Sequence, residues 1–172
     1  MIDMKITTKK IALGAVLTAL ALGLSTLENL FPISFLIPLP GVKLGLANIV
    51  TVFALYELGA LPALLILIGR CFLGALFAGN FNALLFSLMG GVLAMLVMIA
   101  LKHLPALSIY GVSIGGAAAH NVGQICAAMI TLGNTLVLGY LPLLLAVSLF
   151  TGTLTGFVSS LLFRAMKNIK LS

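Results

Sequence analysis

The sequence predicts an all-α integral membrane protein with six transmembrane helices, forming a single transmembrane domain over residues 1–172. Of the 172 residues, 62% are hydrophobic and only 7% are charged, and the mean hydropathy is +1.31. A soluble domain carries about 25% charged residues, so this chain cannot cover itself with a water-facing surface. The length allows about six spans of roughly 20 residues with short connections.

Apolar runs separated by proline and glycine turns indicate the order of the elements. The predicted helices cover residues 11–30, 44–58, 60–78, 83–101, 108–132 and 141–165. The second is short for a full crossing. Between the first two lies "FPISFLIPLPGVK", whose Pro32, Pro38 and Pro40 make a continuous helix improbable. We expect this apolar loop to lie on the membrane or fold into it, and to roof a pocket.

The positive charges predict the orientation. Lysines and arginines gather before the first helix, between the fourth and fifth, and after the sixth: Lys5, Lys9, Lys10, Lys102, Arg164, Lys167 and Lys170. The opposite side has only Lys43. By the positive-inside rule both termini are cytoplasmic. The net charge of +6 therefore reflects topology and does not indicate nucleic-acid binding.

The stretch "GGAAAHNVGQ", residues 115–124, places three hydrogen-bonding side chains near the middle of the fifth helix. His120 and Gln124 are one helical turn apart on a face of small residues, whereas Asn121 points away from that face. Polar side chains inside a membrane either join neighbouring helices or line a cavity. For His120 with Gln124 we favour contact with a ligand. For Asn121, and for Asn48 at the start of the second helix, both interpretations stay open.

Arg70 lies near the centre of the third predicted helix, in "LIGRCFLG". An arginine at that depth costs roughly 3 kcal/mol on insertion scales unless it is compensated. It must therefore face the interior and meet an acceptor. That acceptor is either Glu28, in a structural ion pair, or a ligand. Because Lys43 and Arg70 outnumber the one nearby carboxylate, the expected ligand is an anion such as a carboxylate or phosphate.

These residues predict a pocket that opens toward the outer face. The candidate substrate-binding residues are Lys43, Asn48, Arg70, Asn80, His120, Asn121 and Gln124. The acidic residues Asp3, Glu28 and Glu57 do not pair, and no nucleotide-binding motif or metal-ligand cluster is present in the sequence. We therefore expect no metal, no cofactor and no catalysis by this chain.

The first helix carries a face of small residues, Ala12, Ala15 and Ala19, in "IALGAVLTALALG". Ala15 and Ala19 have the small-x-x-x-small spacing that lets another helix approach closely, which suits a partner helix or packing within the bundle. Gly152 and Gly156 form a second such face in the sixth helix.

Four stretches resemble one family: "PGVKLGLANIVT" (40–51), "GRCFLGALFAGN" (69–80), "SLMGG" (87–91) and "GGAAAHNVGQ" (115–124). They resemble the Gx transporters, often labelled heptaprenyl diphosphate synthase component I. That family is similar to the S-components of energy-coupling factor (ECF) transporters, six-helix proteins with cytoplasmic termini and an outward substrate site. In those proteins an Ala-x-x-x-Ala face on the first helix contacts the transmembrane coupling subunit of an ATPase module, and Ala15 and Ala19 match it.

The resemblance implies an S-component-like, substrate-binding subunit for uptake of a small, anionic or amphiphilic molecule, embedded among the lipids of a bacterial cytoplasmic membrane. The synthase label conflicts with the residues, because prenyl diphosphate synthases need clustered aspartates for Mg²⁺ and Asp3 is the only aspartate. The alternative is a non-catalytic membrane accessory or scaffold for quinone–isoprenoid metabolism or flavin-based extracellular electron transfer. In that case the polar cluster holds helices together.

Overall fold

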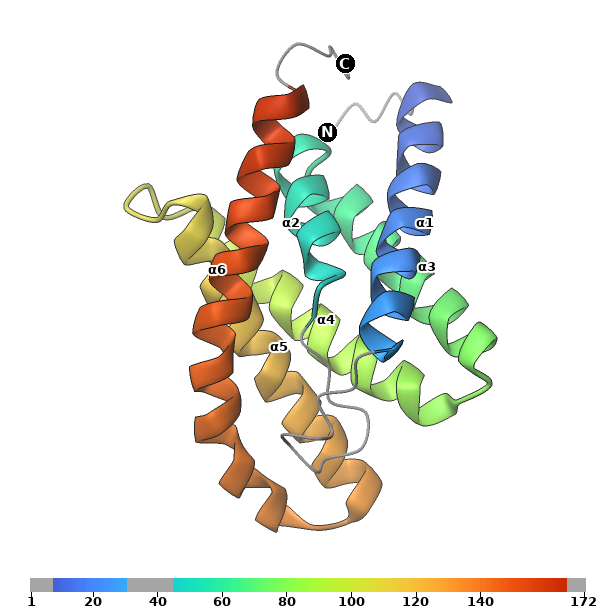
Figure 1. Ribbon diagram of the computed structural model, residues 1–172, viewed down its shortest axis with the longest axis vertical. Helices are drawn as coiled ribbons and strands as arrows, with labels where there is room; N and C mark the ends of the chain where they lie inside the picture. Colours follow the sequence, from blue (N-terminus) through green and yellow to red (C-terminus); the bar gives the residue numbers. More distant parts are fainter. Residues whose placement is uncertain (1–7, 31–44, 167–172) are drawn as a thin grey trace.

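The computed structural model describes residues 8–30 and 45–166, and these residues form helices without a strand (Figure 1). The elements in chain order are α1 (Thr8–Leu30), α2 (Asn48–Glu57), α3 (Ala60–Ala78), α4 (Phe81–Lys102), α5 (Ile109–Leu132), the short 3₁₀ helix η2 (Thr135–Tyr140) and α6 (Leu141–Met166). The prediction of an all-α protein is confirmed.

Four helical segments in the described part of the chain are long and apolar enough to cross a membrane. They are Lys10–Glu28 within α1, the helices α3 and α4, and Thr135–Ala165, which joins η2 to α6. Of the other two helices, α2 has only ten residues and α5 carries strongly polar side chains. The start of α1 and the end of α6 lie at the same end of the bundle, the top in Figure 1. The protein is therefore a helical chain suited to a multi-pass membrane arrangement.

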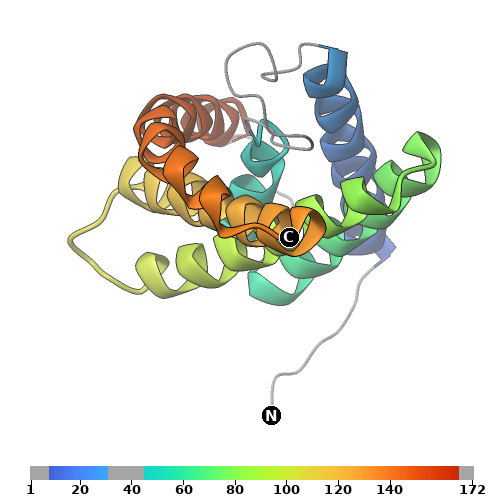
Figure 2. The same ribbon diagram turned by 90° about the horizontal axis from the view of Figure 1, so that it is seen from below.

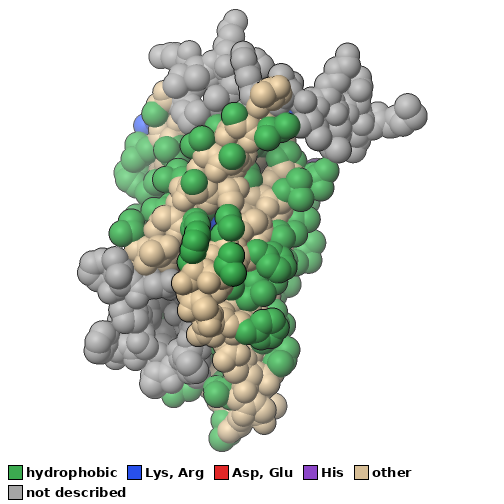
Figure 3. Space-filling view, turned by 90° about the vertical axis from the view of Figure 1, so that its right-hand side faces the viewer, with side chains coloured by type: hydrophobic (Ala, Val, Ile, Leu, Met, Phe, Trp, Pro, Cys, Tyr) green, Lys and Arg blue, Asp and Glu red, His purple; other side chains and the backbone are tan. Residues whose placement is uncertain are grey.

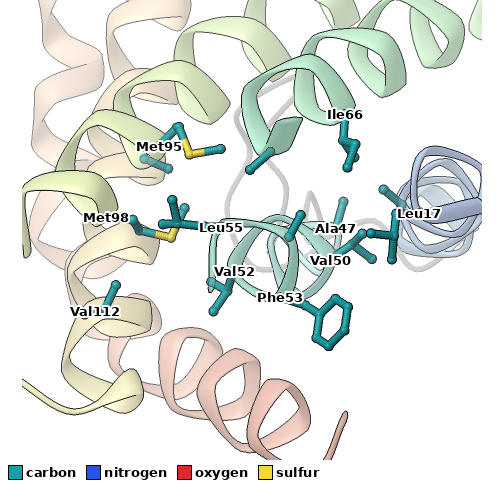
Figure 4. Close-up of a cluster of buried hydrophobic side chains, with 14 residues drawn as sticks. Leu17, Ala47, Val50, Val52, Phe53, Leu55, Ile66, Met95, Met98 and Val112 are labelled. Atoms are coloured by element: carbon teal, nitrogen blue, oxygen red, sulfur yellow. The ribbon is translucent and has the colours of Figure 1, made fainter. Parts of the chain in front are cut away.

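The shortest helix, α2, lies at the centre of the bundle, between α1 and α6 (Figure 2). Its residues from Asn48 to Leu55 are all buried, so this part of the helix has no face left for lipid or water, while Glu57 at its end is exposed. Phe53 and Leu55 belong to a core that includes Leu17 of α1 and Met95 of α4 (Figure 4). A helix that is enclosed by protein on every side need not span the bilayer, which accounts for its length.

Glycines allow α4, α5 and α6 to pack with their backbones close together. A Cβ atom on Gly123 of α5 would lie 2.4 Å from the carbonyl oxygen of Met89 in α4. One on Gly152 of α6 would lie 2.5 Å from the Cα of Ile114 in α5. Gly156 likewise faces α5. The small-residue face that the sequence indicates on the sixth helix is thus an internal packing face.

Several helix ends differ from the predicted bounds by one to three residues, and two further differences concern the start of α2 and the stretch after α5. Helix α2 begins at Asn48 and not at residue 44, because Gly45 has a φ of +83°, outside the helical region. The stretch after α5, expected to be an irregular turn, contains the 3₁₀ helix η2. Its first turn is capped by Asn134, whose side-chain oxygen accepts a hydrogen bond from the amide of Leu136 at 2.8 Å.

Candidate functional site

The structure separates the predicted pocket residues into groups. Asn48, His120 and Gln124 meet in one buried polar cluster, while Arg70 lines a different cavity. Asn80 and Asn121 each have a local bonding role described below. Lys43 and the proline-rich loop lie outside the described residues.

The polar cluster joins the start of α2 to the middle of α5. His120 and Gln124 are both buried, and their Nε2 atoms are 3.1 Å apart. A Cβ atom on Gly45 would lie 2.8 Å from Nδ2 of Asn48 and 3.4 Å from Cδ2 of His120, which places both side chains against this glycine. The Oδ1 atom of Asn48 is buried and has no hydrogen-bond partner among the described residues. The cluster therefore brings together three of the predicted site residues.

Gly90 of α4 provides the room for the imidazole ring. A Cβ atom at this position would lie 2.9 Å from both Cε1 and Nδ1 of His120. The ring thus lies directly against the backbone of α4. Gly90 is not among the residues predicted for the site, although the paired glycines of the "SLMGG" stretch are a signal of close helix packing at this position.

Glu28 sits at the end of α1 and binds the backbone that leads into α2. Its carboxylate accepts hydrogen bonds from the amides of Gly45, at 2.5 Å, and Leu46, at 3.2 Å. Glu28 is buried, with 5% of its surface exposed. A carboxylate at backbone amides preceding a helix is electrostatically favourable. The expected alternative, an ion pair with Arg70, is not formed among the described residues.

Asn121 and Asn80 both bond to backbone groups. The side-chain amide of Asn121 donates to the carbonyl oxygen of Leu144 in α6, at 2.7 Å, so it links α5 to α6. Asn80 is exposed and caps α4, because its Oδ1 accepts from the amide of Asn82 at 2.9 Å. These contacts give each residue a structural role that does not require a ligand.

Arg70 lies on α3 and is 95% buried, since only 5% of its surface is exposed. It lines a cavity of about 20 Å³ between α1, α3 and α4. Ser25 and Thr26 contribute to the wall from α1, and Ser87 contributes from α4. The remaining wall is largely made of small residues, including Gly74 and Ala78.

The guanidinium of Arg70 has unused donors. Its Nε and Nη2 atoms are buried and have no hydrogen-bond partner within residues 8–30 and 45–166. Arginine keeps its positive charge in proteins, and a buried charge without a partner is strongly unfavourable. The wall of the cavity therefore carries a positive charge that no described side chain neutralises. The sequence alone indicates Arg70 but not Ser25 or Ser87, because serines are common in apolar helices and the sequence does not show which neighbouring helix they face.

The small face of α1 points outward. Ala12, Ala15 and Ala19 are exposed on this helix. A Cβ atom on Gly23, further along, would meet nothing within 4 Å. Only 17% of the apolar span of α1 is buried, compared with 28% for that of α3 and 39% for that of α4. Of these three spans, that of α1 has the smallest buried share among the described residues.

The comparison with known proteins places this helical bundle in a family. The family model described as heptaprenyl diphosphate synthase component I matches residues 17–162. The chain belongs to this family. No curated protein and no solved structure matches the chain.

The match to heptaprenyl diphosphate synthase component I covers both the Arg70 cavity and the cluster around His120. Within the described ranges of this family member, no group of three His, Cys, Asp or Glu side chains is placed to hold a metal ion. The buried polar groups of the described chain are hydroxyls and side-chain amides, together with the carboxylate of Glu28, the imidazole of His120 and the guanidinium of Arg70. Such groups can bind and orient a small molecule.

Proposed function

We propose that the protein is the substrate-binding membrane subunit, similar to an S-component, of an uptake transporter of the energy-coupling factor type. It takes up a small, anionic or amphiphilic molecule across a bacterial cytoplasmic membrane and does no chemistry on it. Its six helices traverse or enter the bilayer with both termini in the cytoplasm. The energy comes from an ATPase module, which this chain contacts through a transmembrane coupling subunit.

The observation that carries this proposal is the outward position of Ala12, Ala15 and Ala19 on α1. The second candidate face, at Gly152 and Gly156, is already occupied by α5. Small side chains on a free helix face let another transmembrane helix approach closely, with van der Waals packing as the driving force. A docking role for α1 accounts for a small-residue stripe that the fold itself does not use.

A binding role is supported by buried polar atoms that the protein leaves unpaired. The side-chain oxygens of Asn48, Ser113 and Thr151 have no hydrogen-bond partner in the part of the chain that the structure describes, and the same holds for two nitrogens of Arg70. Each such atom costs about 1–3 kcal/mol when it is buried without a partner. A ligand or water that reaches these atoms offsets the cost.

The test is co-expression with an energy-coupling module and purification through a tag on that module. We expect the double variant Ala15→Leu, Ala19→Leu to lose co-purification and uptake, because the leucines keep the partner helix away. Ala146→Leu is the matched control, since Ala146 is an exposed alanine of α6. The proposal fails if the double variant still co-purifies and transports like the control.

A second function, a membrane scaffold, is favoured by the hydrogen bond from Asn121 to the carbonyl oxygen of Leu144. It shows that at least one residue of the "GGAAAHNVGQ" stretch joins two helices. A scaffold of quinone–isoprenoid or electron-transfer machinery would co-purify with a membrane enzyme of that metabolism and not with the energy-coupling module. It would also give no ligand-dependent change in thermal stability.

A further inference from the structure

We propose that the cavity between α1, α3 and α4 binds the carboxylate group of a ligand, held side-on by Arg70 and by the hydroxyls of Ser25 and Ser87. This inference names the substrate class of the proposed transporter subunit and in that respect rests on the proposed function. The site is separate from the cluster around His120, because no residue of α2 or α5 lines this cavity.

The unused nitrogens of Arg70 are the pair that recognises a carboxylate. The N–H bonds of Nε and Nη2 run parallel along one edge of the guanidinium, and these are the two buried atoms without a partner. Two parallel N–H groups match the two oxygens of one carboxylate in a bidentate contact. A spherical ion such as chloride uses the charge but not this geometry.

The hydroxyl groups of the cavity complete the donor set. No hydrogen bond from the side chain of Ser25 or Ser87 is formed within the described part of the chain, although both line the cavity. Thr26 is different, because its hydroxyl already donates to the carbonyl oxygen of Leu22 at 2.9 Å. Among the described residues that line the cavity, Ser25 and Ser87 are therefore the two hydroxyl donors available to an anion beside Arg70.

The positive charge of Arg70 favours a ligand group that carries a single negative charge. Among the described residues, Arg70 is the only charged one that lines the cavity, so a monoanionic carboxylate balances it, whereas a doubly charged phosphate leaves one charge uncompensated. The face of the bundle that carries α1, α3 and α4 shows no acidic side chain among its coloured atoms (Figure 3). No carboxylate of the described chain competes for the site, because Glu28 bonds to the amides of Gly45 and Leu46 and Glu57 is exposed at the end of α2.

The size of the cavity limits what enters it. A volume of about 20 Å³ is room for one small polar group and not for a whole substrate molecule. The rest of the ligand must therefore lie outside the cavity, along the apolar flank formed by the helices. Both a short soluble carboxylate and the head of an amphiphilic one present the same group to Arg70.

The experiment measures the thermal midpoint of the full-length protein in detergent with acetate, octanoate, acetamide and chloride, at equal ionic strength. We expect both carboxylates to raise the midpoint by about 3 °C or more at saturation, while acetamide and chloride leave it unchanged. A larger shift with octanoate than with acetate identifies an amphiphilic carboxylate, and equal shifts identify a small soluble one.

Three variants make the result specific to Arg70. Arg70→Met abolishes the carboxylate shift and, by removing an unpaired buried charge, raises the midpoint of the ligand-free protein. Arg70→Lys keeps the charge but loses the parallel donors, so the shift falls by at least half. Arg164→Met removes an exposed arginine at the end of α6 and keeps the full shift. The proposal is overturned if chloride stabilises as well as acetate, or if Arg70→Met retains the shift.

Failure of this inference can be told apart from failure of the proposed function. Arg70→Met leaves the exposed face of α1 intact, so it still co-purifies with the energy-coupling module if the transporter assignment is correct. A protein that binds the module but shows no carboxylate shift refutes the substrate class alone. A protein that shows the shift but never binds the module refutes the transporter role alone.

Discussion

The carboxylate of Glu28 accepts a hydrogen bond from the backbone amide of Gly45, 17 residues later in the chain, at 2.5 Å. A second bond, from the amide of Leu46, occupies the other carboxylate oxygen at 3.2 Å. One buried side chain thus connects the end of α1 to the start of the central helix. Gly45 suits this contact because its φ of +83° is readily adopted only by glycine.

Removing the Glu28 carboxylate should destabilise the bundle. We expect Glu28→Ala to lower the free energy of unfolding by about 1–3 kcal/mol, because two amides near the start of α2 lose their charged acceptor. Glu28→Gln keeps one acceptor oxygen and should lose less. The measurement is the thermal midpoint in detergent, with Glu57→Ala as control, since Glu57 is exposed. Equal midpoints for Glu28→Ala and the control would contradict the connecting role.

Two glycines should respond in opposite ways to the same substitution. Gly123→Ala places a methyl group 2.4 Å from the carbonyl oxygen of Met89, and backbone cannot yield as a flexible side chain can. We expect a loss of about 1–3 kcal/mol or more from overpacking. Gly23→Ala meets nothing within 4 Å in an exposed helix and should gain about 0.5–1 kcal/mol. Thermal midpoints of both variants measure the difference, and a neutral Gly123→Ala would show that α4 and α5 can separate without cost.

Most of the helices could be predicted from the sequence, because long apolar runs bounded by glycine and proline determine them locally. The predicted range of the third helix, 60–78, is the same as that of α3. The predicted start of α2, at residue 44, was wrong. The left-handed backbone at Gly45 and the contact of Gly45 with Glu28 arise from tertiary structure, which the local sequence does not show. The burial of Arg70 followed from the cost of a charge in the membrane.

The division of the candidate site could not be predicted. Helical periodicity shows which residues share a face of one helix, as it did for His120 and Gln124, but not which helices become neighbours. The grouping of Arg70 with Ser25 and Ser87 depends on the packing of α1, α3 and α4. Likewise, only the approach of α6 to α5 gives Asn121 a backbone acceptor at Leu144. Membership of a site is thus decided by the packing of the helices.

The role of Asn121 can be tested by its effect on stability alone. Asn121→Ala leaves the carbonyl oxygen of Leu144 without its donor in a buried setting, so we expect a loss of about 1–3 kcal/mol. The carboxylate shift at Arg70 should be unchanged, because Asn121 does not line that cavity. Asn82→Ala, at an exposed asparagine, is the control for stability. A stable Asn121→Ala protein that lost its ligand response would instead assign Asn121 to binding.

Lys102 at the end of α4 should stabilise the far end of the central helix. Its Nζ donates to the carbonyl oxygen of Leu55 at 2.8 Å and lies 4.7 Å from the centre of the Tyr56 ring. The last carbonyls of any helix lack intrahelical donors, and α2 is so enclosed that the Leu55 side chain is 1% exposed. We expect Lys102→Met to lower the free energy of unfolding by about 1–2 kcal/mol, because both a charged hydrogen bond and a cation–π contact are lost.

Two further variants serve as controls. Lys102→Arg keeps the charge and should lose less stability than Lys102→Met. Lys10→Met, at an exposed lysine of α1, should have no effect. If both Lys102 variants have the same thermal midpoint as Lys10→Met, the hydrogen bond from Lys102 to the carbonyl oxygen of Leu55 does not contribute to stability.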